Sequence, residues 1–458
     1  MSDQLPPVAV SAPGKVLLAG GYLVLDRKYT GLVFGLDARI HVHIKPVATG
    51  TGVTISEITV ESPQFEGAIW EYGYRLAGGG GGINVTQLRA DADLSLNRNP
   101  FIETALAYAL SYISNEVPGM ITPAHITILA DNSYYSTSSP SSRFHDFGVP
   151  LSAAHKTGLG SSAALVTAFT AALLSHYLPS NVFDLHSERG RRRVHNLAQA
   201  AHCAAQGKVG SGFDVASAVF GSCLYRRFSP SILTSQGEPA SPNFAANLRN
   251  LINESGEGAE WDTEILKDRV KVPQGLRLIM CDVSCGSQTP GMVKQVLKWR
   301  QDTGEEAEEL WRRLQQSNED LAQELVNLAE NGGSYDKLKD CIGEIRTYIR
   351  KMSAMSGVPI EPPAQTELID ACCQIEGVIG GVVPGAGGYD AIALLIEDKE
   401  EVIQKLAKLL DGWEVKTQAE EGPSVGKVSI LGVREEMQGV RMEDSRGYGD
   451  WIEYALEK

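Results

Sequence analysis

The chain reads Lys156-Thr157-Gly158-Leu159-Gly160-Ser161-Ser162-Ala163-Ala164 and continues as an almost wholly apolar stretch to Leu178. Apolar residues on every face predict a helix over 162–178 that is buried inside a domain. The start of a helix leaves N–H groups unpaired, and its aligned peptide dipoles place about half a positive charge there. Because the two glycines let the backbone approach a ligand closely, this segment predicts a phosphate-binding turn. The hydroxyls of Ser161 and Ser162 can add a phosphate donor or a magnesium ligand.

Other interpretations of this turn remain. Gly158-x-Gly160-x-x-Ala163 satisfies the loose dinucleotide-binding pattern, and Asp184 follows at about the spacing that this pattern requires. The preceding residues 150–157 do not form the continuous apolar strand that leads into a Rossmann turn. The chain has no Gly-x4-Gly-Lys-Ser/Thr match, which argues against a P-loop kinase. A helix start with a purely structural purpose is the remaining alternative.

Three further segments, on either side of this turn, carry glycines and charge. Residues 11–22 place Lys15 in an otherwise apolar hairpin, where it either pairs with an anion or lies exposed at the turn. Residues 206–214 end in Asp214, which is either the N-cap of the following helix or a functional acid. The glycines of residues 382–390 serve either a turn or the close approach of a ligand. No single segment decides between its two interpretations.

Composition limits the class of protein. The 458 residues exceed what one hydrophobic core usually supports, and 43% hydrophobic with 21% charged residues indicate a folded chain of two domains. A formal net charge of −15 argues against a nucleic-acid partner. Seven scattered cysteines, an odd number, favour reduced thiols over a disulfide framework or a zinc site.

The sequence also gives expectations about compartment and assembly. No stretch approaches the roughly 20 apolar residues of a membrane helix, so we expect no membrane partner. Residues 1–7 lack the pattern of a secretory signal, and the C-terminal residues match no targeting address. We therefore expect a cytoplasmic protein. Its oligomeric state, monomer or homodimer, is left open.

Strand and helix patterns mix in both halves of the chain, which predicts the α+β class. The five glycines at 78–82 predict a mobile surface loop, with ligand lining as the alternative. The polar stretch that begins at Ser229 predicts the inter-domain connection, so the expected division is 1–228, 229–262 and 263–458. Strands are expected at 8–10, 16–19, 39–44, 276–283 and 391–396, and helices at 162–178, 305–330, 367–374 and from Asn99-Pro100 onward.

Taken in order, the four segments resemble the GHMP kinase family, named for galactokinase, homoserine kinase, mevalonate kinase and phosphomevalonate kinase. Its three motifs are similar to residues 13–22, 158–164 and 384–388, so the resemblance spans about residues 8–396. It implies an N-terminal α/β domain of the ribosomal protein S5 domain 2-like type and a C-terminal ferredoxin-like domain. The active site is then expected in the cleft between them, with ATP and Mg²⁺ as cofactors.

Within the family, the sequence of these segments resembles the fungal and plant branch whose acceptor is phosphomevalonate. Mevalonate kinases usually have Gly-Glu-His where this chain has Gly20-Gly21-Tyr22. The resemblance implies transfer of the γ-phosphoryl group of ATP in the mevalonate route to isoprenoids and sterols. A mevalonate kinase is the alternative within the family. A ligand sensor without catalysis is a second one, but it should lack the lysine, the acid or the Gly-Ser turn, and all three are present.

The resemblance also assigns residues to roles. A phosphate monoester is largely dianionic near pH 7, so cations that bring two polyanions together matter more than a base. Lys15 is expected at the attacking phosphate, with Asp214 holding it in place through an ion pair. Magnesium is expected on Ser162, ATP phosphates and water, because residues 201–205 contain no acid where related kinases have a glutamate ligand. The expected nucleotide-binding residues are Lys156, Thr157, Gly158, Leu159, Gly160, Ser161, Ser162, Ala163 and Ala164, and the expected substrate-binding residues are Lys15, Tyr22, Lys208, Ser211, Asp214, Ser287 and Thr289.

Overall fold

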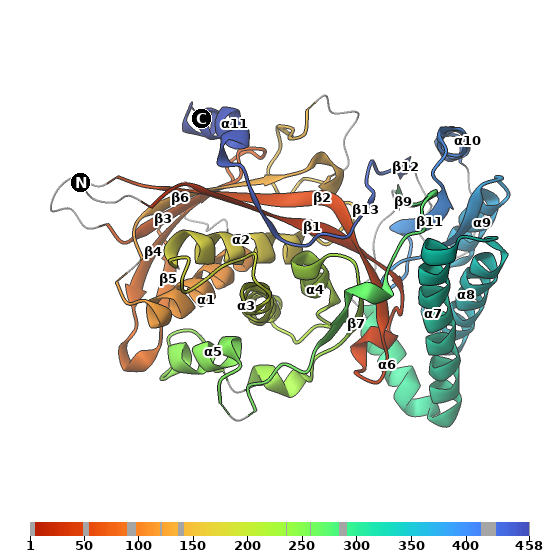
Figure 1. Cartoon of the computed structure of the whole chain (residues 1–458), viewed down its shortest axis with the longest axis horizontal. Coiled ribbons are helices and arrows are strands. Elements are labelled where there is room, and N and C mark those ends of the chain that lie inside the picture. Colours follow the sequence, from red (N-terminus) through yellow and green to blue (C-terminus); the bar gives the residue numbers. More distant parts are fainter. Residues whose placement is uncertain are drawn as a thin grey trace.

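The computed structural model describes residues 5–48, 55–88, 98–119, 121–135, 142–234, 236–256, 258–283, 291–413 and 427–457. Two sheets with their helices form two domains, confirming the α+β class (Figure 1). Of the helices in these ranges, none combines the length and apolarity needed to cross a bilayer. The two domains meet where the first strand of the chain approaches the second sheet (Figure 1).

The N-terminal domain is a strongly twisted sheet with helices on one face (Figure 1). Its main path runs β14-β1-β2-β6-β3-β4-β5, in which β3 lies parallel to β6 and the other pairs are antiparallel. The bounds of these strands are β1 (Val8–Ala19), β2 (Gly31–Pro46), β3 (Glu57–Glu61), β4 (Ile69–Leu76), β5 (Ile83–Gln87), β6 (Ala124–Ala130) and β14 (Arg441–Glu443). The helices are α1 (Pro100–Glu116), α2 (Ser161–Tyr177), α3 (Glu188–Gln206), α4 (Phe213–Phe220) and α5 (Phe244–Asn253).

Local sequence explains where the two central helices begin. The side chain of Asn99 caps α1 by accepting from the backbone N–H of Ile102 at 3.3 Å, and Pro100 occupies the first turn, as expected. Helix α2 begins directly after Gly160, whose φ of 81° is left-handed and suits glycine. It is buried nearly all round, which confirms the prediction for 162–178.

The predicted pair of short strands at 8–10 and 16–19 is wrong, because β1 runs without a break from Val8 to Ala19. Pro13-Gly14 is accommodated as a register irregularity against β2 instead of ending the strand. Gly14 is needed there because an added Cβ would lie 3.0 Å from the carbonyl oxygen of Leu159. The turn that we predict to bind phosphate therefore packs directly on this irregularity.

The glycine run at 78–82 connects β4 to β5. Gly78–Gly80 are exposed and form a short 3₁₀ turn, whereas Gly81 and Gly82 are buried, so the predicted surface loop is confirmed only for its first part. Its last two members also make close contacts. An added Cβ at Gly81 would lie 2.8 Å from the carbonyl oxygen of Ala240, and one at Gly82 would lie 2.4 Å from Ser111 Oγ. Glycine is therefore required here by packing against neighbouring segments.

The polar stretch after Ser229 folds onto the N-terminal domain instead of forming a free connection. It contains α5, which packs on α1 and is held by hydrogen bonds from Tyr112 to Asn253 at 2.8 Å and from Arg249 to Glu116 at 2.6 Å. Strand β8 (Glu264–Leu266) still pairs with β7 (Cys223–Arg226) of the first sheet. The chain thus leaves the N-terminal domain only after β8, later than the expected 229–262.

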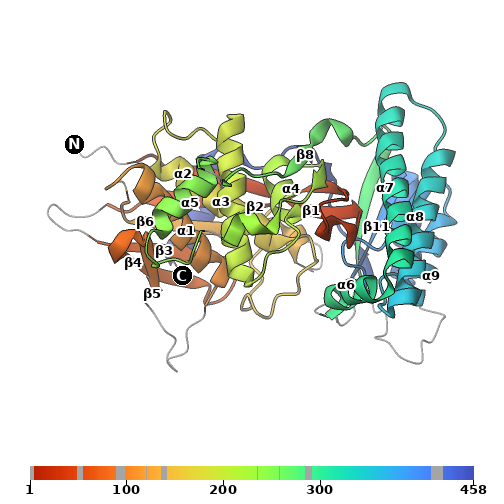
Figure 2. The ribbon, with the colours of Figure 1, turned by 90° about the horizontal axis from the view of Figure 1, so that it is seen from below.

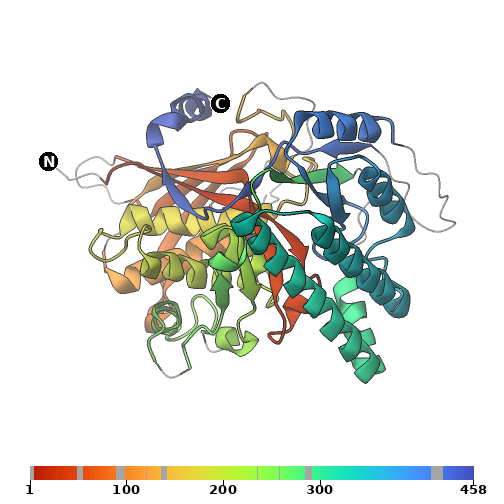
Figure 3. The same cartoon turned by 45° about the vertical axis from the view of Figure 1, so that its right-hand side comes forward.

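The C-terminal domain has the strand order β12-β9-β11-β10, antiparallel throughout, which is the ferredoxin-like arrangement implied by the resemblance. Its strands are β9 (Leu276–Val283), β10 (Val378–Val382), β11 (Ala391–Glu397) and β12 (Val428–Ile430). Helices α9 (Pro363–Cys373) and α10 (Glu400–Asp411) cover one face of the sheet. The long helices α7 (Glu305–Asn331) and α8 (Asp336–Ser356) stand side by side, with α6 (Met292–Thr303) at one end of them (Figures 2 and 3).

The C-terminal segment returns to the first domain, which differs from the expected division of 263–458 as one unit. Strand β13 (Glu435–Glu436) pairs with β2, β14 pairs with β1, and α11 (Gly449–Glu457) lies on the face of the sheet opposite α1–α5 (Figure 1). The C-terminal domain is therefore inserted between two parts of the N-terminal domain.

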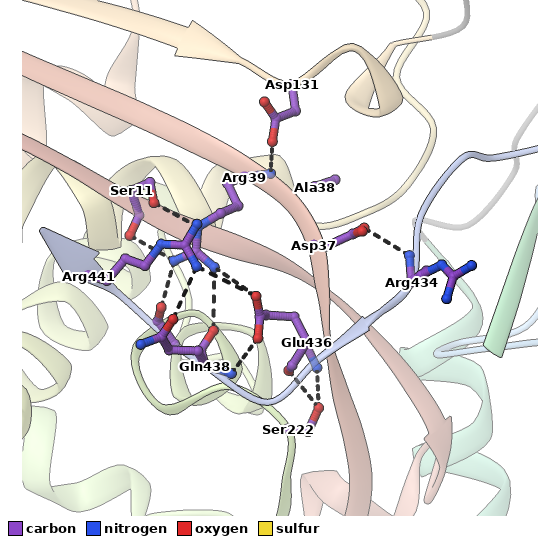
Figure 4. A network of polar contacts seen from close by, with 12 residues as sticks. Ser11, Asp37, Ala38, Arg39, Asp131, Ser222, Arg434, Glu436, Gln438 and Arg441 are labelled. Carbon is purple, nitrogen blue, oxygen red and sulfur yellow. Dashed lines mark hydrogen bonds and ion pairs between the residues drawn. The ribbon is translucent and has the colours of Figure 1, made fainter. Parts of the chain in front are cut away.

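Arg39 connects the returning C-terminal segment to the first sheet. It is 1% exposed, and its guanidinium donates to Ser11 Oγ at 2.7 Å and to the carbonyl oxygen of Gly439 at 2.6 Å (Figure 4). Its backbone N–H donates to Asp131 at 2.9 Å. Burial lowers the pKa of Arg39 to about 10. One side chain thus joins β1, β2 and the returning segment.

Candidate active site

Lys15 lies along the glycine-rich turn. Its backbone N–H donates to the carbonyl oxygen of Leu159 at 2.9 Å, and its Nζ lies 3.4 Å from the carbonyl oxygen of Gly158. The turn fits the side chain closely, since an added Cβ at Gly160 would lie 2.7 Å from Lys15 Cε. The predicted lysine and the predicted turn are therefore in contact, although 143 residues separate Lys15 from Gly158.

The Lys15 ammonium is held in a poorly solvated place. Burial lowers its pKa, and the negative charge of Asp214 acts in the opposite direction. Its Nζ lies 5.7 Å from the centroid of the Phe213 ring, a weak cation–π distance. A cation in such surroundings is stabilised strongly by an anion that enters the site.

Asp214 stands in the first turn of α4. The cap position is taken by Gly212, with φ 85°, so the N-cap interpretation of Asp214 is wrong. Its Oδ1 accepts from the backbone N–H of Val215 at 3.0 Å. Among the described residues, Lys15 and Asp214 interact through their charges without a direct ion pair within 4 Å. The expected ion pair is therefore looser than we predicted.

His202, on α3, is a residue of the site that sequence reasoning did not identify as functional. Its Nε2 lies 3.1 Å from Ser162 Oγ, and its Nδ1 lies 3.9 Å from Asp214 Oδ2. The ring of Phe101 stacks on it with centroids 5.6 Å apart. Helix α3 carries a second buried histidine, His195, and nothing in the sequence distinguishes His202 from it, so the pattern gave no signal for this position.

An aromatic cavity of about 100 Å³ adjoins the start of α2. Lys156, Ser161 and Ser162 line it on the side of the phosphate-binding turn. Its other walls include Asn99 and four aromatic rings, those of Phe65, Trp70, Phe101 and Tyr135. Flat apolar walls beside a helix N-terminus suit a planar ring attached to phosphates.

The first and third glycine-bearing motifs meet across the domain boundary. The N–H of Gly385 donates to the carbonyl oxygen of Leu17 at 3.1 Å, and Gly21 is so close that an added Cβ would lie 2.4 Å from the carbonyl oxygen of Gly385. Tyr22 is 3% exposed, and its hydroxyl donates to the carbonyl oxygen of Ala386 at 2.7 Å. The structure thus gives Tyr22 a linking role where we expected substrate contact.

The remaining predicted residues fall in different places. Thr157 is buried and donates to the carbonyl oxygen of Ser133 at 2.6 Å, so it shapes the turn. The carbonyl oxygen of Ser211 accepts from Tyr225 at 2.8 Å beside Asp214. Lys208 is exposed and lines a separate cavity of about 570 Å³ between α1 and the end of α3. Ser287 and Thr289 lie outside the described residues.

The oxygen atoms near the turn suit a cation that is held mainly by a ligand. In the described part of the chain, no group of three or more His, Cys, Asp or Glu residues could hold a metal alone. The side chains of Ser162 and Asp214, on either side of His202, offer oxygen. Mg²⁺ is usually bound by one or two protein oxygens together with substrate phosphates and water, so this donor set fits it.

Known proteins resemble the chain in sequence and in fold. Residues 145–222 match the family model described as the GHMP kinases N terminal domain, and residues 326–414 match GHMP kinases C terminal. The chain is 54% identical to a phosphomevalonate kinase of Gibberella zeae, over 99% of this chain and 100% of that protein. It is 32% identical to the peroxisomal phosphomevalonate kinase of Arabidopsis thaliana, over 95% and 96% of the two chains. A solved structure of Streptococcus pneumoniae phosphomevalonate kinase in complex with phosphomevalonate and AMPPNP has a TM-score of 0.58 at 17% identity, covering 93% of this chain and all of that one.

Proposed function

The chain belongs to the GHMP kinase family, and from this premise we propose that it transfers the γ-phosphoryl group of ATP to phosphomevalonate, giving ADP and 5-diphosphomevalonate. The observation that carries this proposal is the contact between Lys15 and the Gly158–Ser162 turn. The relatives that match nearly the whole chain support phosphomevalonate as the acceptor.

The nucleotide binds along the start of α2. The unpaired backbone N–H groups of this helix hold the β- and γ-phosphates. The adenine ring occupies the aromatic cavity lined by Phe65, Trp70, Phe101 and Tyr135, which opens beside the same helix start. Lys156 is exposed at the mouth of this cavity, where its ammonium can reach a phosphate.

Transfer forms one bond and breaks one. A terminal oxygen of the acceptor phosphate attacks the γ-phosphorus, the bond from this phosphorus to the β,γ-bridging oxygen breaks, and ADP leaves with that oxygen. The attacking oxygen carries no proton when the phosphate is a dianion, so no base is needed to remove one. The Lys15 ammonium lies between the two anionic groups and reduces their repulsion, which is the main obstacle to this reaction.

Asp214 acts on Lys15 through its charge. An anionic carboxylate nearby favours the protonated form of Lys15, which burial disfavours. Mg²⁺, when bound, would supply positive charge that offsets the charge of the phosphates. Ser162 is the residue that we assign to hold it, with Asp214 as a further oxygen nearby.

A coupled assay of ADP formation tests the proposed function. The purified protein receives ATP and Mg²⁺ with phosphomevalonate, with mevalonate or with no acceptor. We expect turnover with phosphomevalonate at least a hundredfold above the other two reactions. Faster turnover with mevalonate would identify a mevalonate kinase instead, and ATP binding without turnover of either acceptor would favour a sensor.

The compartment stays a prediction. The sequence led us to expect a cytoplasmic protein, whereas the name of the Arabidopsis relative places that protein in peroxisomes. Fractionation of cells that express the tagged chain distinguishes the two locations.

A further inference from the structure

The imidazole of His202 stands between the two oxygen-bearing side chains of the site. Helix α3 lies beside both α2 and α4, so His202 can reach Ser162 on one and Asp214 on the other (Figure 1). Its Nε2 is 3.1 Å from Ser162 Oγ, its Nδ1 is 3.9 Å from Asp214 Oδ2, and the residue is 2% exposed. A buried side chain in this position can influence how the side chains of Ser162 and Asp214 are oriented.

Two neighbours of His202 indicate which ring nitrogen carries the proton. On one side, the carboxylate oxygen of Asp214 lies 3.9 Å from Nδ1, too far for a direct hydrogen bond, and its negative charge favours the tautomer with the hydrogen on Nδ1. On the other side, the amide nitrogen of Gln206 lies 3.4 Å from Nε2 and can only donate, so Nε2 accepts. The single lone pair of Nε2 then faces two donors, and the hydroxyl of Ser162, the nearer of them at 3.1 Å, directs its own hydrogen toward it.

The direction of the Ser162 hydrogen determines what this hydroxyl can bind. A hydroxyl whose hydrogen is used by Nε2 has no donor left for a phosphate oxygen, but its lone pairs remain free. Lone pairs on oxygen are what a hard divalent cation requires. The ring of Phe101 stacks on the imidazole with centroids 5.6 Å apart and limits the tilt of its plane.

We propose that His202 is a positioning residue that orients the Ser162 hydroxyl so that its oxygen faces the divalent cation bound with the nucleotide. This proposal rests on the proposed function, because it takes the start of α2 as the nucleotide site. It assigns His202 to cation binding through Ser162, as groups behind metal ligands commonly act.

Calorimetric binding of ADP with and without Mg²⁺ tests the proposal independently of any acceptor. The quantity of interest is the ratio of the ADP affinity in Mg²⁺ to that in EDTA. His202→Asn removes the acceptor at the Nε2 position, so we expect this ratio to fall by about three- to tenfold, as for the loss of one hydrogen bond. His202→Gln places an amide oxygen near the same position, and we expect it to keep most of the ratio.

Two further variants make the result specific. His195 lies on the same helix two turns earlier, is also 2% exposed, and has Phe220 and Trp261 as ring neighbours. We expect His195→Asn to leave the ratio unchanged, because this residue contacts neither Ser162 nor Asp214. Ser162→Ala should lower the ratio by itself, and adding His202→Asn to it should lower the ratio no further.

Several outcomes would overturn the proposal. One is a His202→Asn variant with the wild-type ratio; another is a variant whose ADP affinity falls equally with and without Mg²⁺, which would indicate packing alone. Additive losses in the double variant would separate His202 from Ser162. If the wild-type protein bound no ADP, the proposed function itself would fail, so the two failures are distinguishable.

Discussion

At the scale of single residues, the candidate site contains a half-buried cation, Lys15, whose charge is incompletely neutralised. Burial lowers the pKa of Lys15, and Asp214 opposes this without touching the ammonium directly. In the free protein the charged form of Lys15 is disfavoured by its surroundings, and the negative charge of bound phosphates would favour it. In the reaction that we propose, Lys15 acts on the phosphates directly and Asp214 acts through Lys15.

This difference predicts unequal effects of two substitutions. Lys15→Met should lower kcat/KM by about a hundredfold or more, since it removes the charge that faces the developing anion. Asp214→Ala should cost less, because the nucleophile needs no base. Steady-state rates across pH 6 to 9 check this order, and an equal or greater loss in Asp214→Ala would show that the acid does more than orient Lys15.

How far single residues could be predicted depended on their surroundings. Lys15 was found because a lysine in an apolar hairpin is unusual, and the resemblance then gave it a role. His202 was missed because the role that we propose for it depends on its neighbours in space. These are Ser162 on α2, 40 residues away in sequence, and Asp214 on α4, 12 residues away. The contact of Tyr22 with the other domain was not predicted, because sequence does not show whether a hydroxyl beside a cleft faces a ligand or a neighbouring domain; its contact with substrate stays a prediction.

At the scale of elements, close packing decides which glycines matter. Gly158 and Gly160 both have positive φ, 73° and 81°, in the same turn. An added Cβ at Gly158 would meet nothing within 4 Å, whereas at Gly160 it would collide with the Lys15 side chain. A substitution at Gly158 therefore introduces backbone strain alone, whereas one at Gly160 introduces the same strain and also displaces Lys15.

We expect Gly160→Ala to reduce kcat/KM at least tenfold more than Gly158→Ala. Both variants pay the same kind of conformational cost of roughly 1 kcal/mol, but only Gly160→Ala moves Lys15. Parallel kinetics and melting curves of the two variants check this expectation. Equal activity losses with equal stability losses would mean that strain alone explains both.

Elements with strong periodicity were predicted well, and those that depend on context were not. The helix expected at 305–330 is α7, and its buried leucines at 310, 314, 321, 325 and 328 lie inward as predicted. Helix α5 was overlooked because its neighbours are rich in proline, serine and glycine, although Phe244, Leu248, Leu251 and Ile252 follow helical spacing. In β1, Pro13-Gly14 resembled a break, but the facing strand absorbs it.

At the scale of the whole molecule, the two domains are connected twice by the chain, which passes into the C-terminal domain and returns from it, and they also contact each other. The chain enters the C-terminal domain through β9 and leaves it through β12, and these two strands are neighbours in one sheet. No pattern in sequence could have predicted the return, because β13 and β14 are two and three residues long. Such short strands exist only because β1 and β2 present edges to them.

The hydrogen bonds of Arg39 predict that this residue holds the returning C-terminal segment on the first sheet. Arg39→Met should lower the free energy of unfolding by about 3 kcal/mol, because it leaves several buried acceptors without a donor. Arg434→Ala, which removes only an exposed ion pair with Asp398, should cost under about 1 kcal/mol. Denaturant titrations of both variants provide the check, and similar midpoints would show that the returning segment is held elsewhere.

The antiparallel pairing of β1 with β14 has a mechanical consequence. Ala9 faces Glu443 and Ser11 faces Arg441, so the outer ends of the two strands lie at the same end of the ladder. A force applied through the segments before Val8 and after Glu443 would load the rungs one after another, as in a zipper, and would not shear them together. An unfoldase that grips the C-terminus would therefore first pull Tyr448 away from His41 and Phe144, and would then peel β14 from β1 and release the hydrogen bonds of Arg39.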